Sequence, residues 1–145
     1  MAKNTREHLS RFNYLLGETE AAYHEASVKL GCSDSAVKIL YAICDNGGSC
    51  PLRTIRRRSG LSKQTMNSAI RKLEAEGVLY LENAGARAKN ACLTDVGRAV
   101  AKRTAMRIQQ IENDILAYWS EEELETYLRL TEQFLVKFRE RTAQL

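Results

Sequence analysis

Residues 61–76 contain the side chains whose types and spacing are best suited to contact another macromolecule. Seven polar side chains of this stretch can hydrogen-bond to phosphates or to the edges of bases: Ser62, Lys63, Gln64, Thr65, Asn67, Ser68 and Arg71. Gln and Asn amides pair with adenine edges, guanidinium groups pair with guanine or phosphate, and hydroxyls pair with phosphate or with either kind of base. This is the chemistry of a surface that reads double-stranded DNA.

The stretch is predicted to be a helix with two chemically different faces. Its apolar residues recur at helical spacing and form one stripe: Met66, Ala69, Ile70 and Leu73. Ser62 can cap the first turn, because its hydroxyl can accept a hydrogen bond from an otherwise unpaired amide. Gly77 can take the left-handed position that ends a helix, so the helix is expected to run from Lys63 to Glu76.

A second, shorter helix is predicted just before it. Pro51 at the first helical position and Gly60 just past the last turn delimit this helix. Two helices joined by a tight glycine-containing turn predict a helix-turn-helix. Its second helix has the size to lie in a major groove with its N-terminal residues facing base edges.

The residues after this unit have the composition of a two-stranded hairpin, or wing. Residues 78–82 and 91–93 are typical of strands, and the loop between them carries two cations and no acid. Arg87 near the tip is the candidate for insertion into a minor groove, where a narrow groove concentrates negative potential. Lys89 is expected to follow the phosphate backbone. An ordinary solvated loop cation is the alternative interpretation of Arg87.

The positive charge is concentrated on this reading unit. Residues 53–103 hold 12 Lys and Arg against 4 Asp and Glu, a net +8, whereas residues 1–52 (5 against 6) and 104–145 (5 against 8) are net −1 and −3. Such a segment attracts phosphate without regard to sequence. Arg53 is a DNA-binding candidate, and Arg56, Arg57 and Arg58 follow it on the same predicted helix. Successive residues of a helix are about 100° apart, so the four arginines cannot all face one way. We interpret this group as phosphate steering; a solvated charged face is the alternative.

These residues together resemble the MarR family of winged-helix transcriptional regulators. The resemblance rests on the two helices, on Gly77-Val78-Leu79 at the first wing strand, on Arg87 six residues before Leu93, and on Leu93-Thr94-Asp95-Val96-Gly97 opening a long helix. It covers nearly all 145 residues. The sequence departs from the family pattern at Gly85, where the family has an Asp that helps to orient the wing arginine.

The resemblance implies a mainly α fold of about six helices with a small β-hairpin wing. It implies a single domain over residues 1–145, with a winged helix-turn-helix over 32–103 and dimerisation helices over 1–31 and 104–145. The residues agree: helical spacing runs from about Thr5 to Leu30, a second helix capped by Ser33 or Asp34 ends at residues 46–48, and a single long helix is expected from Asp95 to Trp119.

A last helix begins at a capping box, Ser120-Glu121-Glu122-Glu123, and keeps apolar residues at spacings of three and four. The terminal helices carry much of the aromatic content, which favours a homodimer over a monomer. A two-fold dimer places two identical heads about one helical turn of DNA apart, and so predicts a palindromic operator.

The resemblance also implies a small aromatic or phenolic effector, bound between the dimerisation helices and the winged helix. The residues that could contribute are His8, Phe12, Tyr14 and Tyr41, with Tyr23 and His24 as further candidates. Aromatic residues at helical spacing are also typical of an ordinary core, and this alternative stays open. On this interpretation the protein is a repressor that an effector releases from its operator.

Four cysteines, Cys32, Cys44, Cys50 and Cys92, show neither paired spacing nor a nearby histidine, so no metal site is expected. Cys44 falls on an apolar helix face. Cys32 and Cys50 are expected at helix starts, where the dipole can stabilise a thiolate, and they are the candidates for a redox switch. Inert thiols are the alternative.

Other classes of protein have less support in the sequence. No zinc-protease motif, phosphate-binding glycine loop or catalytic triad is present, so neither an enzyme nor a cofactor is expected. No apolar run approaches the roughly 18 residues that span a bilayer, and we expect a cytoplasmic protein without a membrane partner. A winged-helix module that binds protein would need a neutral or acidic face, and the +8 segment argues against it.

Overall fold

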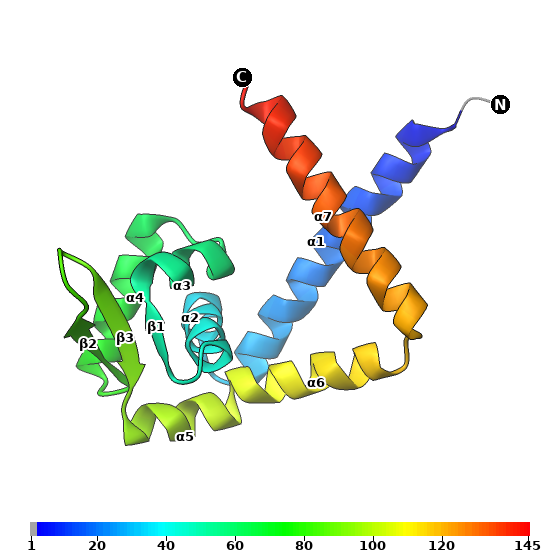
Figure 1. Cartoon of the computed structure of the whole chain (residues 1–145). Helices are drawn as coiled ribbons and strands as arrows, with labels where there is room; N and C mark the ends of the chain where they lie inside the picture. The colour runs from blue at the N-terminus through cyan, green and yellow to red at the C-terminus, as the bar shows by residue number, and fades with distance from the viewer. Residues whose placement is uncertain (1–2) are drawn as a thin grey trace. The chain divides into compact units, whose positions relative to one another are not determined.

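The computed structural model describes residues 3–145, and over that range the chain forms seven helices and a three-stranded antiparallel sheet (Figure 1). The expected mainly α winged-helix fold is thereby confirmed. The chain divides into two compact units, one ending at Ile108 and the other covering Gln109–Leu145, which we describe separately. None of the described helices is both long and apolar enough to cross a membrane.

Apart from strand β1 and the break between α5 and α6, the elements follow one another along the chain in the expected order. Their bounds are α1 Thr5–Lys29, α2 Asp34–Asp45, β1 Ser49–Pro51, α3 Leu52–Ser59, α4 Lys63–Ala75, β2 Leu79–Asn83, β3 Lys89–Leu93, α5 Asp95–Arg103, α6 Ala105–Ala117 and α7 Glu121–Thr142.

The core of the first unit lies where α2, α3 and α4 pack beside the sheet (Figure 1). Its largest fully buried side chains are Ile39, Leu40, Ile43, Ile55 and Leu79. They come from α2, α3 and β2, so no single element could bury them alone. Burying an aliphatic side chain of this size stabilises a fold by about 1.5–3 kcal/mol, which fixes the two helices of the helix-turn-helix against the sheet.

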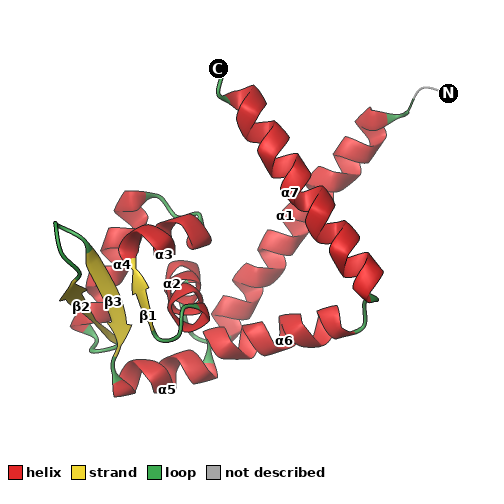
Figure 2. Ribbon diagram, viewed as in Figure 1, coloured by secondary structure: helices red, strands yellow, loops and turns green. Residues whose placement is uncertain are grey.

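The sheet has the strand order β1-β3-β2, so the expected hairpin carries a third strand (Figure 2). Both outer strands pair with β3. Ala91 of β3 lies opposite Cys50 of β1 on one side and opposite Leu81 of β2 on the other. The sequence prediction missed β1 because three residues are too few to show an alternating pattern. Pro51 ends this strand and is the N-cap of α3, whereas the sequence pattern predicts it at the first helical position.

The Leu93–Gly97 motif joins the wing to α5 through two contacts. The Thr94 hydroxyl accepts a hydrogen bond from the Gly97 amide (2.9 Å) and donates to the Gly77 carbonyl (2.6 Å). A Cβ at Gly97 would lie 1.8 Å from the Val78 carbonyl oxygen. The threonine therefore caps α5 and ties it to the start of the wing, and the glycine permits the close approach.

The expected continuous helix from Asp95 to Trp119 is wrong, because the structure breaks it between α5 and α6. Thr104 has φ −125° and ψ −92°, outside the helical region, and its hydroxyl donates to the Val100 carbonyl at 2.7 Å. A threonine hydroxyl that bonds to the carbonyl four residues earlier is a known cause of helix bending. Thr104 is also buried (2% exposed).

Helix α1 has little cover from the rest of the first unit. It begins at an Asn4 cap, and Ser27, close to its end, is its buried residue among those described. Gly31, with φ +73°, then turns the chain toward α2. His24 and Asp34 link the two helices, since His24 Nδ1 lies 2.8 Å from Asp34 Oδ2. This hydrogen bond holds the pKa of Asp34 below its usual value.

The second unit consists of the end of α6 and helix α7. The predicted capping box is confirmed: the Glu123 amide donates to the Ser120 hydroxyl (3.1 Å), and the Ser120 amide donates to the Glu123 carboxylate (2.9 Å). The second bond lowers the pKa of Glu123. Trp119 packs edge-on against Tyr127, and no residue of α7 is buried.

Candidate DNA-binding surface

Helix α4 presents one row of polar side chains directly away from the core. Met66, Ile70 and Leu73 are its buried residues. At about 100° per residue, Gln64, Ser68 and Arg71 lie on the opposite side of the helix, and all three are exposed. Lys63, Thr65 and the half-buried Asn67 flank this row. The structure therefore brings the predicted amide, hydroxyl and guanidinium groups to one accessible face.

Ser62 and Thr65 have a role in positioning this face. The Ser62 hydroxyl accepts from the Thr65 amide (3.2 Å) and donates to the Thr65 hydroxyl (2.9 Å), so Ser62 is the N-cap of α4 as predicted. A helix start with satisfied amides is well defined, and it fixes where Lys63 and Gln64 point.

Two serines that the sequence did not single out as contacts lie beside this helix. Ser33 and Ser35, at the start of α2, line a shallow surface depression together with Gln64, Thr65 and Ser68. Ser33 is the N-cap of α2, and its hydroxyl accepts from the Ala36 amide at 3.1 Å. Its capping role was readable from the sequence, but its position next to α4 depends on how α2 and α4 pack.

The four arginines of α3 do not all face one way, as the sequence predicted. Arg58 forms an ion pair with Asp45 at the end of α2. Arg53, Arg56 and Arg57 are exposed, and their i, i+3, i+4 spacing puts all three on one side of α3, away from the buried Ile55. Three of the four arginines thus share a face, and the fourth is held by an acid.

The wing tip has an unusual backbone. Gly85, Ala86 and Arg87 have positive φ values of 86°, 32° and 69°, and the loop is closed by the Ala84 amide on the Ala88 carbonyl (2.9 Å). Glycine adopts such a conformation without steric cost, whereas other residues rarely do. The departure from the family pattern at Gly85 therefore has a local reason. Arg87 and Lys89 are both exposed at this tip.

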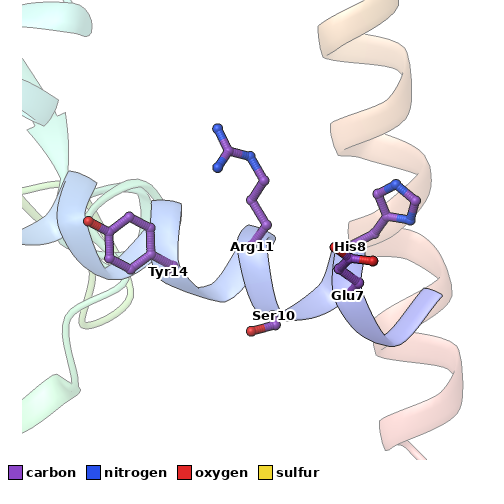
Figure 3. A pocket seen from close by; sticks show the side chains of 5 residues that line it. All are labelled: Glu7, His8, Ser10, Arg11 and Tyr14. Carbon is purple, nitrogen blue, oxygen red and sulfur yellow. The ribbon is translucent and has the colours of Figure 1, made fainter. Parts of the chain in front are cut away.

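The predicted effector residues lie on two helices. His8 and Tyr14 line a shallow depression on α1 together with Glu7, Ser10 and Arg11, and Figure 3 shows that all five side chains come from this one helix. The ring nitrogen Nδ1 of His8 is 2.8 Å from the Asn4 carbonyl of the same helix.

The remaining effector candidates are placed differently. Phe12 is also on α1 and is partly exposed, whereas Tyr41 is half-buried and packs against the core of the winged helix. His24, a further candidate, contacts Asp34.

The two redox candidates differ in their surroundings. Cys50 is not at a helix start as expected; it is in strand β1, fully buried, and burial raises its pKa. A buried thiol with a raised pKa is poorly suited to react as a thiolate. Cys32 is half-exposed in the turn before α2. Cys92, which the sequence did not single out, is buried and donates to the Glu82 carboxylate at 3.3 Å.

Comparisons with known proteins agree with this fold. The model of the MarR family matches residues 30–88, which contain α2, β1, α3, α4, β2 and the wing loop but not β3. No curated protein sequence matches the chain at a significant level.

Solved structures extend the likeness to nearly the whole chain. A MarR-family transcriptional regulator from Silicibacter pomeroyi is 23% identical, with 88% of this chain and 87% of that chain covered and a TM-score of 0.69. MepR of S. aureus, solved as a DNA complex, is 17% identical with 94% and 99% covered and a TM-score of 0.72. NadR, solved in complex with 4-hydroxyphenylacetate, is 12% identical with 92% and 93% covered and a TM-score of 0.66.

Proposed function

We propose that this chain, which carries the winged helix-turn-helix of the MarR family of transcriptional regulators, is a homodimeric regulator that binds double-stranded DNA sequence-specifically. The observation that carries the proposal is the row formed by Gln64, Ser68 and Arg71. These side chains project from a helix that the core holds firmly, and no acid lies in the first three turns of that helix. In a major groove, Gln64 would read adenine, and Arg71 would read guanine or contact phosphate.

The wing and α3 would supply contacts outside the major groove. Arg87 would enter the adjacent minor groove, and Lys89 would bind the phosphate backbone. Arg53, Arg56 and Arg57 would attract phosphates electrostatically, because no acid pairs with them among the residues described. If these contacts form, the affinity for DNA should fall steeply as the salt concentration rises.

The terminal helices support the proposal of a homodimer. Large apolar side chains are exposed on α1, α6 and α7, and Leu15, Ile115 and Phe138 are examples that are 47%, 52% and 56% exposed. Patches of this kind on a folded chain typically mark an interface. A second copy of the chain would cover them and would place two α4 helices for a palindromic operator.

We further propose that the protein is a repressor released by a small aromatic effector. NadR binds 4-hydroxyphenylacetate and has the same fold, which is the support for an aromatic ligand. His8, Phe12, Tyr14 and Tyr41 remain the candidates to contact it. Release would follow if the ligand changed the distance between the two reading helices, because both must match the groove spacing.

A salt series of DNA binding tests the central claim. The protein would be titrated against a fragment from its own upstream region and against a scrambled fragment of equal length, at several salt concentrations. Tight binding that prefers the native fragment and weakens with salt supports the proposal. Equal, weak binding to that fragment and to a wider panel of genomic fragments would contradict it and favour a protein-binding module.

A Gln64→Ala variant separates base reading from phosphate attraction. Loss of a bidentate base contact costs about 1–3 kcal/mol of discrimination. The variant should therefore bind the native fragment more weakly and leave binding to the scrambled fragment and the salt dependence unchanged. An equal loss on both fragments would show that Gln64 does not read bases.

A further inference from the structure

Asn46 is the one asparagine of the chain that a glycine follows. Asparagine is chemically labile, because the backbone nitrogen of the next residue can attack its side-chain carbonyl carbon. Glycine assists this attack, since it has no Cβ to obstruct the approach and its backbone reaches conformations that other residues avoid. Asn46 and Gly47 are both exposed, so water has access to the reacting groups.

The folded chain holds both reacting groups by hydrogen bonds. Asn46 is the C-cap of α2, and its Nδ2 donates to the Ser49 carbonyl at 2.7 Å. The Gly47 amide donates to the Cys44 carbonyl at 3.1 Å, and the glycine has a φ of +82°. Both bonds must break before the Gly47 nitrogen can attack. The turn therefore slows the reaction without preventing it, because exposed helix ends open more easily than the core.

We propose that Asn46 is a site of spontaneous deamidation and that its conversion loosens strand β1. The Gly47 nitrogen loses its proton and forms a bond to Asn46 Cγ. The bond from Cγ to Nδ2 breaks, ammonia leaves, and a five-membered succinimide remains. One water molecule then opens the ring at either carbonyl and gives aspartate or isoaspartate. The net change takes up one water and releases one ammonia, so no oxidant or reductant is required.

The Asn46 amide makes a contact that an acid cannot make. β1 is an outer strand of the sheet, and Asn46 supplies it with a hydrogen bond from outside the sheet. An ionised carboxylate has no hydrogen to donate, and it repels the Ser49 carbonyl oxygen. It also lies next to Asp45 at the C-terminal end of α2, where the helix dipole disfavours negative charge. Deamidation therefore weakens the attachment of β1 to the end of α2.

The modified strand leads directly into α3, the first helix of the helix-turn-helix. An effect of deamidation on DNA binding would rest on the proposed function, whereas the deamidation itself does not. The measurements that test it involve no DNA. Their failure would leave the proposed function untouched, and the reverse also holds.

Peptide mass spectrometry of the full-length protein, kept at neutral and at mildly alkaline pH, would follow the replacement of NH2 by OH at each asparagine. Asn83 is the matched control: it is exposed, and the next amide, of Ala84, is also hydrogen-bonded (2.9 Å to the Ala88 carbonyl), but alanine carries a Cβ. Asn46 should be converted about tenfold faster than Asn83. Equal conversion of the two asparagines, or no conversion of Asn46, would overturn the inference.

Unfolding the chain in urea tests the role of the turn. The conversion of Asn46 should accelerate about tenfold or more, since the two hydrogen bonds of the turn no longer hold the reacting groups. An equal rate in the native and the unfolded chain would overturn the inference that the turn controls the reaction.

Hydrogen exchange measures the loosening of β1. The Leu93 amide donates to the Gly48 carbonyl at 3.0 Å, so its exchange reports whether the chain at the start of β1 stays attached to β3. It should exchange about tenfold faster in Asn46→Asp and in deamidated protein, whereas the Met66 amide of α4, bonded to the Ser62 carbonyl at 2.9 Å, should not change. Asn46→Ala, which loses the hydrogen bond without adding a charge, should lie between. Unchanged exchange of Leu93 in Asn46→Asp would overturn the inference.

Discussion

The winged helix and the terminal helices differ in how they treat their apolar side chains. In the winged helix, Ile39, Ile43 and Ile55 are completely buried, and a continuous cluster joins α2, α3, α4 and the sheet. In α7 no residue is buried, and in α1 Ser27 is the one buried residue described. One region thus has its own core, whereas the other has apolar side chains that stay exposed.

This difference predicts that substitutions in the two regions affect different properties of the protein. A change in the core of the winged helix should unfold the chain, because its packing cannot relax fully. A change on α7 should leave the fold of the chain intact and alter the proposed association with a second copy. The following variants test that division.

The largest effect is expected for Phe138→Glu, which puts a charge on the apolar face of α7. Burying an unpaired carboxylate in an interface costs several kcal/mol, so the dimer dissociation constant should rise about a hundredfold or more. Sedimentation velocity measures the change. Val96→Glu on α5 is the matched control, since Val96 is similarly exposed (58% against 56%) but lies in the winged helix. Equal effects of the two changes would contradict the division.

Gly97→Ala should destabilise the winged helix by about 1–3 kcal/mol, because the added methyl group would collide with the Val78 carbonyl. Thermal and urea unfolding would measure it. Gly17→Ala on α1 is the control: no atom lies within 4 Å of that Cβ position, and the better helix propensity of Ala should leave stability unchanged or raise it by up to about 1 kcal/mol. A neutral Gly97→Ala would mean that α5 does not approach the wing so closely.

Arg87→Ala at the wing tip should weaken operator binding by about 1–3 kcal/mol without changing stability. Arg87→Gly should lose the same affinity and gain some stability, because glycine accepts a φ of 69° without strain. Fluorescence anisotropy at fixed salt and urea unfolding would separate the two properties. If both variants bind the operator like the parent, the wing arginine is only a solvated cation.

Thr94→Ala should lower the free energy of unfolding by about 1 kcal/mol, because α5 loses its cap. The hydroxyl also donates to Gly77, so Thr94→Ser, which keeps both bonds, should restore most of the loss. If serine failed to rescue stability, the methyl group rather than the hydroxyl would be the important part of Thr94.

The smallest effect is expected at the link between α1 and α2. His24 lowers the pKa of Asp34, so the carboxylate contributes stability above its usual pKa of 3.8 and loses that contribution as the pH falls through the lowered value. Asp34→Asn should therefore be less stable than the parent at neutral pH, and the difference should shrink toward pH 3. A difference that is constant with pH would exclude this ion pair as its source.

Local signals were sufficient for the elements that carry the site. Ser62 and Gly77 define α4 because capping and left-handed glycines depend on neighbouring residues alone, and the apolar stripe of α4 identified its buried side. The exposed row of Gln64, Ser68 and Arg71 followed from the same periodicity. The motif from Leu93 to Gly97 marked the start of α5 for the same reason.

Other features were decided by contacts between distant residues. Strand β1 exists because residues 49–51 pair with β3, some forty residues later. Cys50 is buried in that strand, where a helix start was expected. Arg58 forms an ion pair with Asp45, which belongs to a different helix. None of these partners can be identified from local spacing.

By itself, the sequence determined the order of helices, the wing, the concentration of positive charge and the polar face of α4, because these depend on periodicity, caps and composition. Only the tertiary structure decided that Ser33 and Ser35 adjoin α4, that Arg58 reaches Asp45, and that residues 49–51 pair with β3. Each of these depends on the packing of elements that are separated along the chain.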